Sequence, residues 1–199
     1  MNKLQISSII LLMLFFTYSC SSVKISSDSK GAYGIRHIST KSVEMKIDDA
    51  TYTFYLALFT PYDIKKYYLG VSSLWRIHEN DLLLLKLGNG ETVRLIANTA
   101  SVGKVDWPKY VPIIGGSYTG ISTTQKVDYY STLFDIDIEV LNKIEHHGIN
   151  KMRIEFFSTF YEQSWRTNKL GKYITKSRKK LDEQLKKPYK PEISIEEGF

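Results

Sequence analysis

The sequence predicts an α+β fold that consists mainly of an antiparallel β-sheet. Runs of β-branched and aromatic residues recur between turn signals along most of the chain, which is typical of strands. A short segment with helical spacing, Ile138 to His147, separates two late strands. A basic amphipathic helix is predicted near the end, from about Thr167 to Lys187. The chain has 199 residues, which is enough for one domain with a sizeable core.

The composition is basic and rich in tyrosine. The formal net charge is +6, aromatic residues make up 13% of the chain, and 14 of them are tyrosines. Positive charge favours anionic partners such as phospholipid headgroups, lipopolysaccharide or acidic glycans. The chain contains one cysteine, so no disulfide can form within it and packing must stabilise the fold.

The first residues have the pattern of an export signal. Lys3 is followed by an apolar run from Ile9 to Phe16 and then by small or polar residues around Cys20. This run is far shorter than the roughly 20 residues that span a bilayer. A basic start, a short apolar segment and small residues after it predict a secretory signal.

Ser19, Cys20 and the two serines after it resemble the lipobox of bacterial lipoprotein signal peptides, although Thr17 and Tyr18 depart from the usual pattern. The resemblance implies cleavage before Cys20 and lipidation of its thiol, for example with palmitate. One acyl chain binds a membrane only marginally, whereas two or three chains on one cysteine would hold a domain stably. The resemblance thus implies an exported, membrane-anchored lipoprotein of the bacterial cell envelope, which would not meet nucleic acid.

Four segments are therefore expected along the chain. They are a signal peptide at 1–19, the lipidated cysteine with a flexible tether at 20–41, a single α+β domain at 42–187 and a disordered tail at 188–199. The Ser-, Gly- and Lys-rich composition of 21–41 is the reason for the tether.

The first half of the domain is predicted to be strands. Val43, Met45 and Ile47 alternate as one face of a strand, and a second strand covers 51–60 before Pro61 stops it. Residues 63–68 fit either a helical turn or a loop, and 71–77, which include Trp75, fit a strand.

The clearest local signal is a β-hairpin in residues 82–97, where two apolar runs flank Gly88-Asn89-Gly90. A three-residue loop places Leu85 opposite Val93 and Leu83 opposite Leu95, which makes one face apolar. A two-residue loop would mix charge and hydrocarbon on both faces, so the three-residue loop is favoured, with Gly90 in a left-handed conformation.

Residues 99–124 are predicted to form an irregular stretch that contains either a short strand near 110–114 or a functional loop. A strand is expected at 126–134. Asp137 then caps the helix at 138–147, Gly148 ends it, and a strand covers 149–157. The unit 137–157 also looks like stretches of uncharacterised bacterial lipoproteins, a resemblance that implies no activity. The final helix has one apolar stripe, formed by Leu170, Tyr173, Ile174, Ser177, Leu181 and Leu185.

Two groups of residues are candidate contact sites. Asp106, Trp107, Tyr110 and Tyr118 lie in the irregular stretch and could contact a ligand, because loops often carry function, although ordinary packing is the commoner role. Lys172, Lys176, Lys179 and Lys180 of the final helix could contact an anionic surface, or could simply be solvated.

No residue pattern indicates catalysis, a metal or a cofactor. The stretch Gly115 to Gly120 lacks the Lys of a phosphate loop and the spacing of a nucleophile elbow. His146 and His147 point about 100° apart on a helix and have no third ligand nearby.

The function expected from these features is a non-catalytic module that binds a protein or glycan of the envelope. The alternatives are a hydrolase of cell-wall or glycan substrates and a structural or inhibitory lipoprotein of the immunity type.

Overall fold

The computed structural model describes residues 22–111, 121–156 and 159–190. The predicted signal peptide, Cys20 and the Gly-rich segment around Tyr118 lie outside these residues. The described strands and helices are β1 (Ile25–Lys30), β2 (Arg36–Thr40), β3 (Val43–Ile47), β4 (Ala50–Thr60), β5 (Lys66–Ser73), β6 (Leu82–Leu87), β7 (Thr92–Val111), β8 (Ile121–Ile136), α2 (Ile138–His147), β9 (Ile149–Glu155), β10 (Phe160–Ser164) and α3 (Lys169–Leu185).

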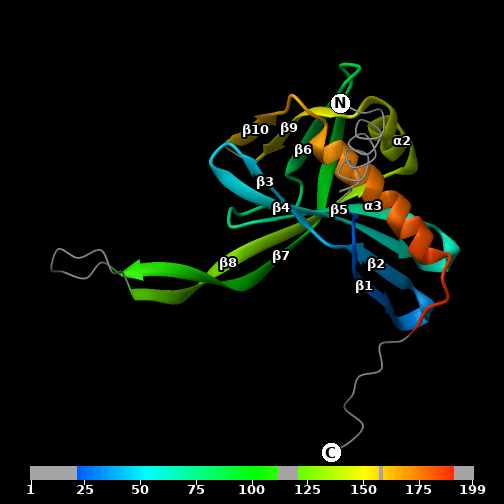
Figure 1. The fold of residues 1–199 in the computed structure, drawn as a ribbon, viewed down its shortest axis with the longest axis horizontal. Coiled ribbons are helices and arrows are strands. Elements are labelled where there is room, and N and C mark those ends of the chain that lie inside the picture. Colours follow the sequence, from blue (N-terminus) through cyan, green and yellow to red (C-terminus); the bar gives the residue numbers. More distant parts are fainter. Residues whose placement is uncertain (1–21, 112–120, 157–158, 191–199) are drawn as a thin grey trace, which may run out of the picture.

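All strands belong to one antiparallel sheet with the order β1-β2-β4-β5-β8-β7-β6-β9-β10, and β3 pairs with β4 beside β2. The sheet curls so that its last strand, β10, returns to the β3–β4 hairpin (Figure 1). The carboxylate of Asp48 in that hairpin accepts a hydrogen bond of 3.0 Å from the backbone N–H of Glu162 in β10. This contact joins the last strand of the sheet order, β10, to the β3–β4 hairpin.

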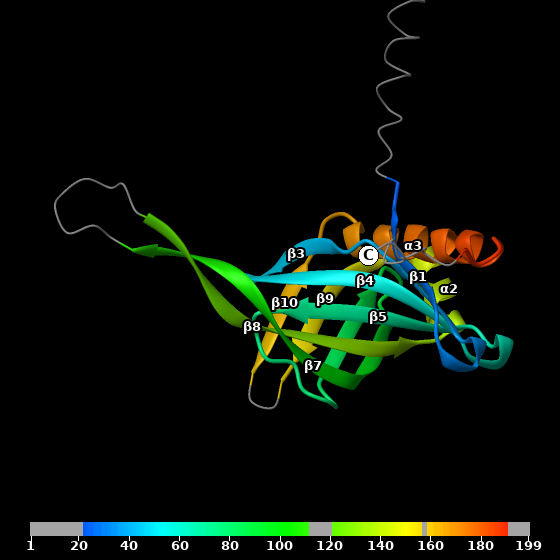
Figure 2. The same cartoon turned by 90° about the horizontal axis from the view of Figure 1, so that it is seen from below.

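The core lies between the curled sheet and α3. Figure 2 shows both helices on the same side of the sheet. Leu170, Ile174 and Leu181 of α3 are fully buried, because helical spacing places them on one face. They pack with strand residues such as Ile38 and Leu58, whose side chains are also fully buried. The predicted α+β fold, with a short helix between late strands and a basic helix at the end, is confirmed.

The predicted 82–97 hairpin forms with the expected register. Leu85 pairs with Val93 and Leu83 with Leu95, and Gly90 has a φ of 91°. The Leu87 N–H donates to the Glu91 carbonyl at 2.8 Å, which leaves three residues in the loop.

The predicted helix α2 also forms where expected. The Asp137 carboxylate accepts a hydrogen bond of 2.7 Å from the Val140 N–H, and Gly148 ends the helix with a φ of 69°. Leu141 and Ile144 are buried, but Ile138, which the spacing predicts on the same face, is 49% exposed because it precedes the first turn that meets the core.

The expected tether at 20–41 is wrong for most of its length. Residues 25–30 and 36–40 form β1 and β2 at one edge of the sheet. Small polar residues obscure the pattern, because β1 is an edge strand with no fully apolar face and β2 buries the polar residues Ser39 and Thr40. Ile38 is nevertheless fully buried, and Arg36 is buried against the end of α3. The folded part of the chain therefore begins by Ile25.

The strand expected at 71–77 lies earlier in the chain. β5 covers 66–73, with Tyr67, Leu69 and Val71 buried on one face. Gly70 interrupts the apolar pattern of this strand, which explains why residues 63–68 could not be assigned from sequence. Trp75 follows the strand and lies in the connection to β6.

The irregular stretch expected at 99–124 is mostly regular. β7 and β8 pair from Ala97 and Phe134 out to Val111 and Ile121, and their outer part projects from the body as a two-stranded arm (Figures 1 and 2). In the described part of the arm, no side chain of residues 102–106 or 125–130 is buried, so these residues need no alternation of apolar and polar side chains. For that reason periodicity did not reveal the strands.

Candidate functional site

Trp75 is a large, exposed aromatic residue at the point where the chain leaves β5. Its side chain is 52% exposed, yet its backbone is fixed on both sides. The Ser73 hydroxyl accepts a hydrogen bond from the Trp75 N–H at 2.8 Å and donates one to the Trp75 carbonyl at 3.0 Å. The indole also packs on the ring of Tyr161, with the centroids 5.5 Å apart. Trp75 is thus an exposed aromatic residue held in one position.

A surface cleft of about 540 Å³ opens beside Trp75. The β3–β4 hairpin, the segment after β5 and the base of the arm form its walls. Residues of three chemical types line it, namely apolar and aromatic side chains, hydroxyls and carboxylates: Glu44, Asp49, Ala50, Thr51, Thr53, Leu74, Trp75, Val105 and Tyr129. We call this cleft the Trp75 cleft.

The charge of the Trp75 cleft is negative, although the protein as a whole is basic. Glu44 and Asp49 contribute two carboxylates, and no lysine or arginine is among the described residues that line the cleft. Carboxylates accept hydrogen bonds and attract cationic groups. The cleft can therefore bind a ligand that presents hydroxyl, amide or amino hydrogens together with a flat apolar face.

Behind Trp75 lies an aromatic cluster that connects β10 to the rest of the sheet. The Tyr161 ring contacts Trp75, Phe156 at 5.7 Å and Tyr52 at 6.3 Å between centroids. Tyr52 is fully buried and burial raises the pKa of its hydroxyl, which finds no hydrogen-bond partner among the described residues. The cluster therefore holds the indole of Trp75 against β10.

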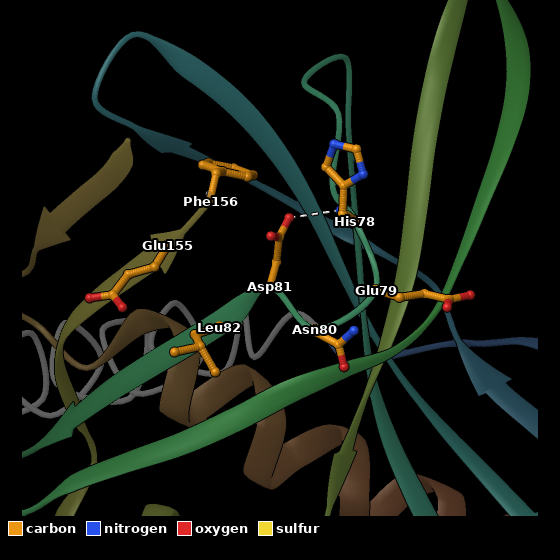
Figure 3. A pocket seen from close by; sticks show the side chains of 7 residues that line it. All are labelled: His78, Glu79, Asn80, Asp81, Leu82, Glu155 and Phe156. Carbon is orange, nitrogen blue, oxygen red and sulfur yellow. Dashed lines mark hydrogen bonds between the residues drawn. The ribbon is translucent and has the colours of Figure 1, made fainter. Parts of the chain in front are cut away.

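A second cleft, of about 580 Å³, is lined in part by Phe156 (Figure 3). Its lining is His78, Glu79, Asn80, Asp81, Leu82, Glu155 and Phe156. The Asp81 carboxylate is already engaged, because it accepts a hydrogen bond of 2.7 Å from the His78 N–H within the turn. Ala97 N–H also donates to the Asp81 carbonyl at 2.9 Å, so this turn is firmly attached to β7.

The acidic groups of the second cleft do not converge. Figure 3 shows Glu79 and Glu155 pointing in opposite directions, with Asp81 between them. Glu155 also lies 3.5 Å from Arg153, which partly neutralises its charge. Glycoside hydrolysis requires two carboxylates that face each other across the bond to be cleaved. This arrangement therefore gives the hydrolase alternative no support at this cleft.

Of the predicted ligand-contact residues, Asp106 is the one whose side chain the structure describes, and it lines neither cleft. Asp106 is exposed on the arm, next to Val105 in sequence, and pairs across the strands with Lys126. The backbones of Trp107 and Tyr110 continue β7 opposite Gln125 and Ser122. Tyr118 lies outside the described residues. The described lining of the Trp75 cleft therefore includes Val105, the sequence neighbour of Asp106.

The four candidate lysines all lie on α3. Lys172, Lys176 and Lys179 are exposed, and Lys180 is partly exposed. Lys179 pairs with Glu145 of α2 at 2.7 Å, and Lys180 pairs with Glu183 at 3.5 Å. The charges of Lys179 and Lys180 are therefore partly compensated within the protein.

No group of three or more potential ligands that could hold a metal ion occurs within residues 22–111, 121–156 and 159–190. His146 contacts the Asn142 carbonyl through Nδ1 at 2.7 Å, and the His146 and His147 rings are 6.4 Å apart between centroids. Over the same ranges, no helix combines the length and the apolar character needed to cross a membrane.

Comparisons with known proteins found no match: no protein-family model, no curated protein and no solved structure resembles the chain significantly.

Sequence reasoning missed the Trp75 cleft because its residues are far apart in the chain. Glu44, Trp75 and Tyr129 come from three separate elements that only the fold brings together. No local pattern indicates it, because adjacent apolar residues such as Leu74 and Trp75 also occur within strands, for example Leu82 to Leu85 of β6.

Proposed function

We propose that this protein is a membrane-tethered, non-catalytic module of the bacterial cell envelope that binds a glycan in the Trp75 cleft. The observation that carries the proposal is a half-exposed tryptophan held rigidly beside two carboxylates. Exposed aromatic residues that are already ordered bind with little loss of conformational entropy.

The chemistry of the lining favours a sugar as the ligand. The apolar face of a sugar ring can stack on the indole of Trp75, as flat apolar surfaces do on aromatic rings. The ring hydroxyls can then donate hydrogen bonds to Glu44 and Asp49 and exchange them with Thr51 and Thr53. Amino sugars gain further, because their positive charge would meet the two carboxylates.

The membrane tether is supported by the sequence around Cys20 and agrees with the position of β1. The first residue of β1 is Ile25, so only four residues, Ser21 to Lys24, lie between Cys20 and the edge of the sheet. A lipid on Cys20 would therefore hold the domain close to the membrane surface.

The anchor is tested first, by intact mass and membrane fractionation of the wild type and a Cys20→Ser variant. We expect acyl mass on the wild type and its recovery in the membrane fraction. The variant should lack that mass and should be released or should keep its signal peptide. A wild type without acyl mass in the soluble fraction contradicts the anchor.

The cleft is tested by co-sedimentation with insoluble cell-wall glycan. Trp75→Ala should weaken binding by about tenfold or more, as expected for an aromatic anchor. Phe160→Ala is a matched control, because Phe160 is equally exposed at 53% but lies in β10 under the Arg153 guanidinium, outside the cleft. Equal binding of the two variants would exclude the Trp75 cleft as the binding site.

A second candidate function, an inhibitory lipoprotein of the immunity type, is favoured by the arm. The arm projects from the body and carries Val102, which is 62% exposed and lies opposite Tyr130 (Figure 2). Apolar residues on a projecting ribbon can insert into a protein partner. A pull-down from envelope extracts that depends on Val102 and not on Trp75 would favour this candidate over glycan binding.

A further inference from the structure

The chain enters the fold beside α3. The Lys41 N–H donates a hydrogen bond of 2.7 Å to the Lys24 carbonyl, immediately before β1 begins. The Tyr173 hydroxyl of α3 donates to the Lys41 carbonyl at 2.7 Å and lies 3.0 Å from the Thr40 hydroxyl. The segment that leads back toward Cys20 therefore leaves the domain next to Tyr173. Figure 2 shows the start of β1 beside α3.

Lysines surround this exit point. On a helix, residues three, four and seven positions away share a face, so Lys169, Lys176 and Lys180 lie along the side of α3 that carries Tyr173. Lys172 lies on the outer side of α3, opposite the buried residues Leu170 and Ile174, and is exposed. The exposed lysines Lys24 and Lys41 extend the positive surface from the helix onto the entering chain. We call this set the anchor-side face: Lys24, Lys41, Lys169, Lys172, Lys176 and Lys180.

Of the two acidic residues of α3, Asp182 is turned to the other side of the helix. Asp182 contacts Lys65 at 2.6 Å and the Tyr67 hydroxyl at 2.8 Å, on the flank that meets β5. Arg178 joins the same flank through Asn142 and Glu145 of α2. Glu183 pairs with Lys180 and is the acidic residue of α3 near the anchor-side face. Positive charge therefore dominates this face.

We propose that the anchor-side face rests on anionic phospholipid headgroups, so that α3 lies against the membrane; the proposal depends on the proposed lipid attachment at Cys20. The four residues from Ser21 to Lys24 reach at most about 14 Å when extended. The Debye length at physiological ionic strength is about 8 Å, so lysines held this close to an anionic leaflet are attracted to it. Two independent features, the exit point and the charge, thus select the same face.

The orientation has a consequence for the rest of the molecule. The helices lie on one side of the sheet, and Figure 2 shows β7 on the side away from α3. With α3 against the membrane, β7 and the exposed residues at the base of the arm face the aqueous space. An envelope ligand could then reach the domain without crossing the lipid-facing side.

The test measures how accessible individual lysines are in the native lipidated protein. The protein is reconstituted into vesicles of phosphatidylcholine alone or of phosphatidylcholine mixed with phosphatidylglycerol, then treated with a membrane-impermeant amine reagent and mapped by mass spectrometry. On the mixed vesicles, labelling of Lys172 and Lys176 should fall by about threefold or more, and high salt should restore it. Labelling of Lys104 and Lys126, which are exposed on the arm, should stay the same on both vesicles.

Charge reversal provides the matched comparison. Lys172→Glu with Lys176→Glu should remove the protection of Lys24 and Lys41 on mixed vesicles, whereas Lys104→Glu with Lys126→Glu, the same change of charge on the arm, should leave it intact. If the protein floats with the vesicles but Lys172 and Lys176 are labelled equally on both kinds of vesicle, the proposed orientation is overturned and the anchor is not. A protein that carries no acyl mass and floats with neither vesicle overturns the anchor and the orientation together.

Discussion

Arg36 and Asp28 form a paired contact at the edge of the sheet, with hydrogen bonds of 2.8 Å from Nε and 2.6 Å from Nη2 to the two carboxylate oxygens. The same guanidinium donates to the carbonyls of Leu185 at 3.2 Å and Lys187 at 2.8 Å, at the C-terminal end of α3. Carbonyls at this end of a helix lack partners within the helix, and a cation also interacts favourably with the helix dipole there. This single side chain therefore joins β1, β2 and α3.

Replacing Arg36 with alanine should lower the free energy of unfolding by about 3 kcal/mol, because it leaves a nearly buried carboxylate and helix carbonyls without their partner. The side chains of Arg36 and Asp28 are only 10% and 17% exposed. Urea denaturation of the two proteins measures the difference.

Lys65→Ala is the control for this prediction, because it also removes one cation from an ion pair. Lys65 is 48% exposed where it meets Asp182, so its loss should cost less than about 1 kcal/mol. Similar losses in both variants would show that the Arg36 contact adds nothing beyond a surface ion pair.

The Asp28 carboxylate should make stability depend on pH in the acid range. The hydrogen bond from Arg36, supported by Gln184, lowers the pKa of Asp28 below its ordinary value. A lowered folded-state pKa means that the contribution is present above the unfolded-state pKa of about 4 and is lost as the pH falls through the folded-state value. The stability advantage of the wild type over Asp28→Asn should therefore shrink between about pH 5 and pH 2.

The comparison with Asp28→Asn is needed because other carboxylates contribute as well. Hydrogen bonds from lysines lower the pKa values of Glu91, Glu145 and Glu162, so the wild type alone reports several groups. Urea denaturation of both proteins at each pH isolates Asp28. An advantage that stays constant down to the lowest pH would refute its role.

Gly70 and Tyr55 face each other across β4 and β5, and the ring of Tyr55 covers the glycine. A Cβ on Gly70 would overlap that ring, so Gly70→Ala should destabilise the fold by about 1–3 kcal/mol. The cost should be smaller by at least about 1 kcal/mol when Tyr55 is already alanine, because the clash is then gone. A double-mutant cycle by urea denaturation measures this coupling.

Gly103→Ala is the matched control for that cycle. Gly103 is also a strand glycine opposite a tyrosine, Tyr129, but its added Cβ would meet only a backbone oxygen at 3.8 Å, an ordinary contact. Gly103→Ala should therefore change stability little. If Gly103→Ala costs as much as Gly70→Ala, the effect belongs to strand glycines in general and not to the Tyr55 ring.

Local patterns made some elements predictable and left others hidden. The 82–97 hairpin was predictable because one of its faces is buried. Only one register places Leu83 and Leu85 on the same face as Leu95 and Val93. Helix α2 was predictable because Asp137 and Gly148 supply its ends. The edge strand β1 and the described side chains of the arm bury little apolar surface, and β2 buries polar residues such as Ser39 and Thr40, so their composition resembles that of loops.

The candidate site was hidden for a different reason. Its geometry depends on the return of β10 to β3, which rests on contacts such as Asp48 with Glu162 between residues 114 positions apart. Turn chemistry and periodicity report neighbours in sequence and carry no information on such pairs. The sequence pattern places Trp75 within a strand, whereas its position outside the strand is what exposes it.

Asn168 lies just before α3, and its side chain should reverse the usual effect on stability of replacing the nearby helical glycine Gly171 with alanine. Its side-chain oxygen accepts a hydrogen bond of 2.9 Å from the Ile149 N–H instead of capping α3. The Asn168 amide also occupies the space where side chains at Gly148 and Gly171 would lie. Alanine in place of a helical glycine normally stabilises by about 1 kcal/mol. Gly171→Ala should instead destabilise the protein.

The Asn168→Ala background separates the two effects. Asn168→Ala alone should cost about 1–3 kcal/mol, because it leaves the buried N–H of Ile149 without a partner, and hydrogen exchange of that amide should accelerate. In this background the space beside Gly171 is empty, so Gly171→Ala should recover its normal propensity and become stabilising in urea denaturation. A destabilising effect of the same size in both backgrounds would show that the Asn168 side chain is not what excludes a side chain at position 171.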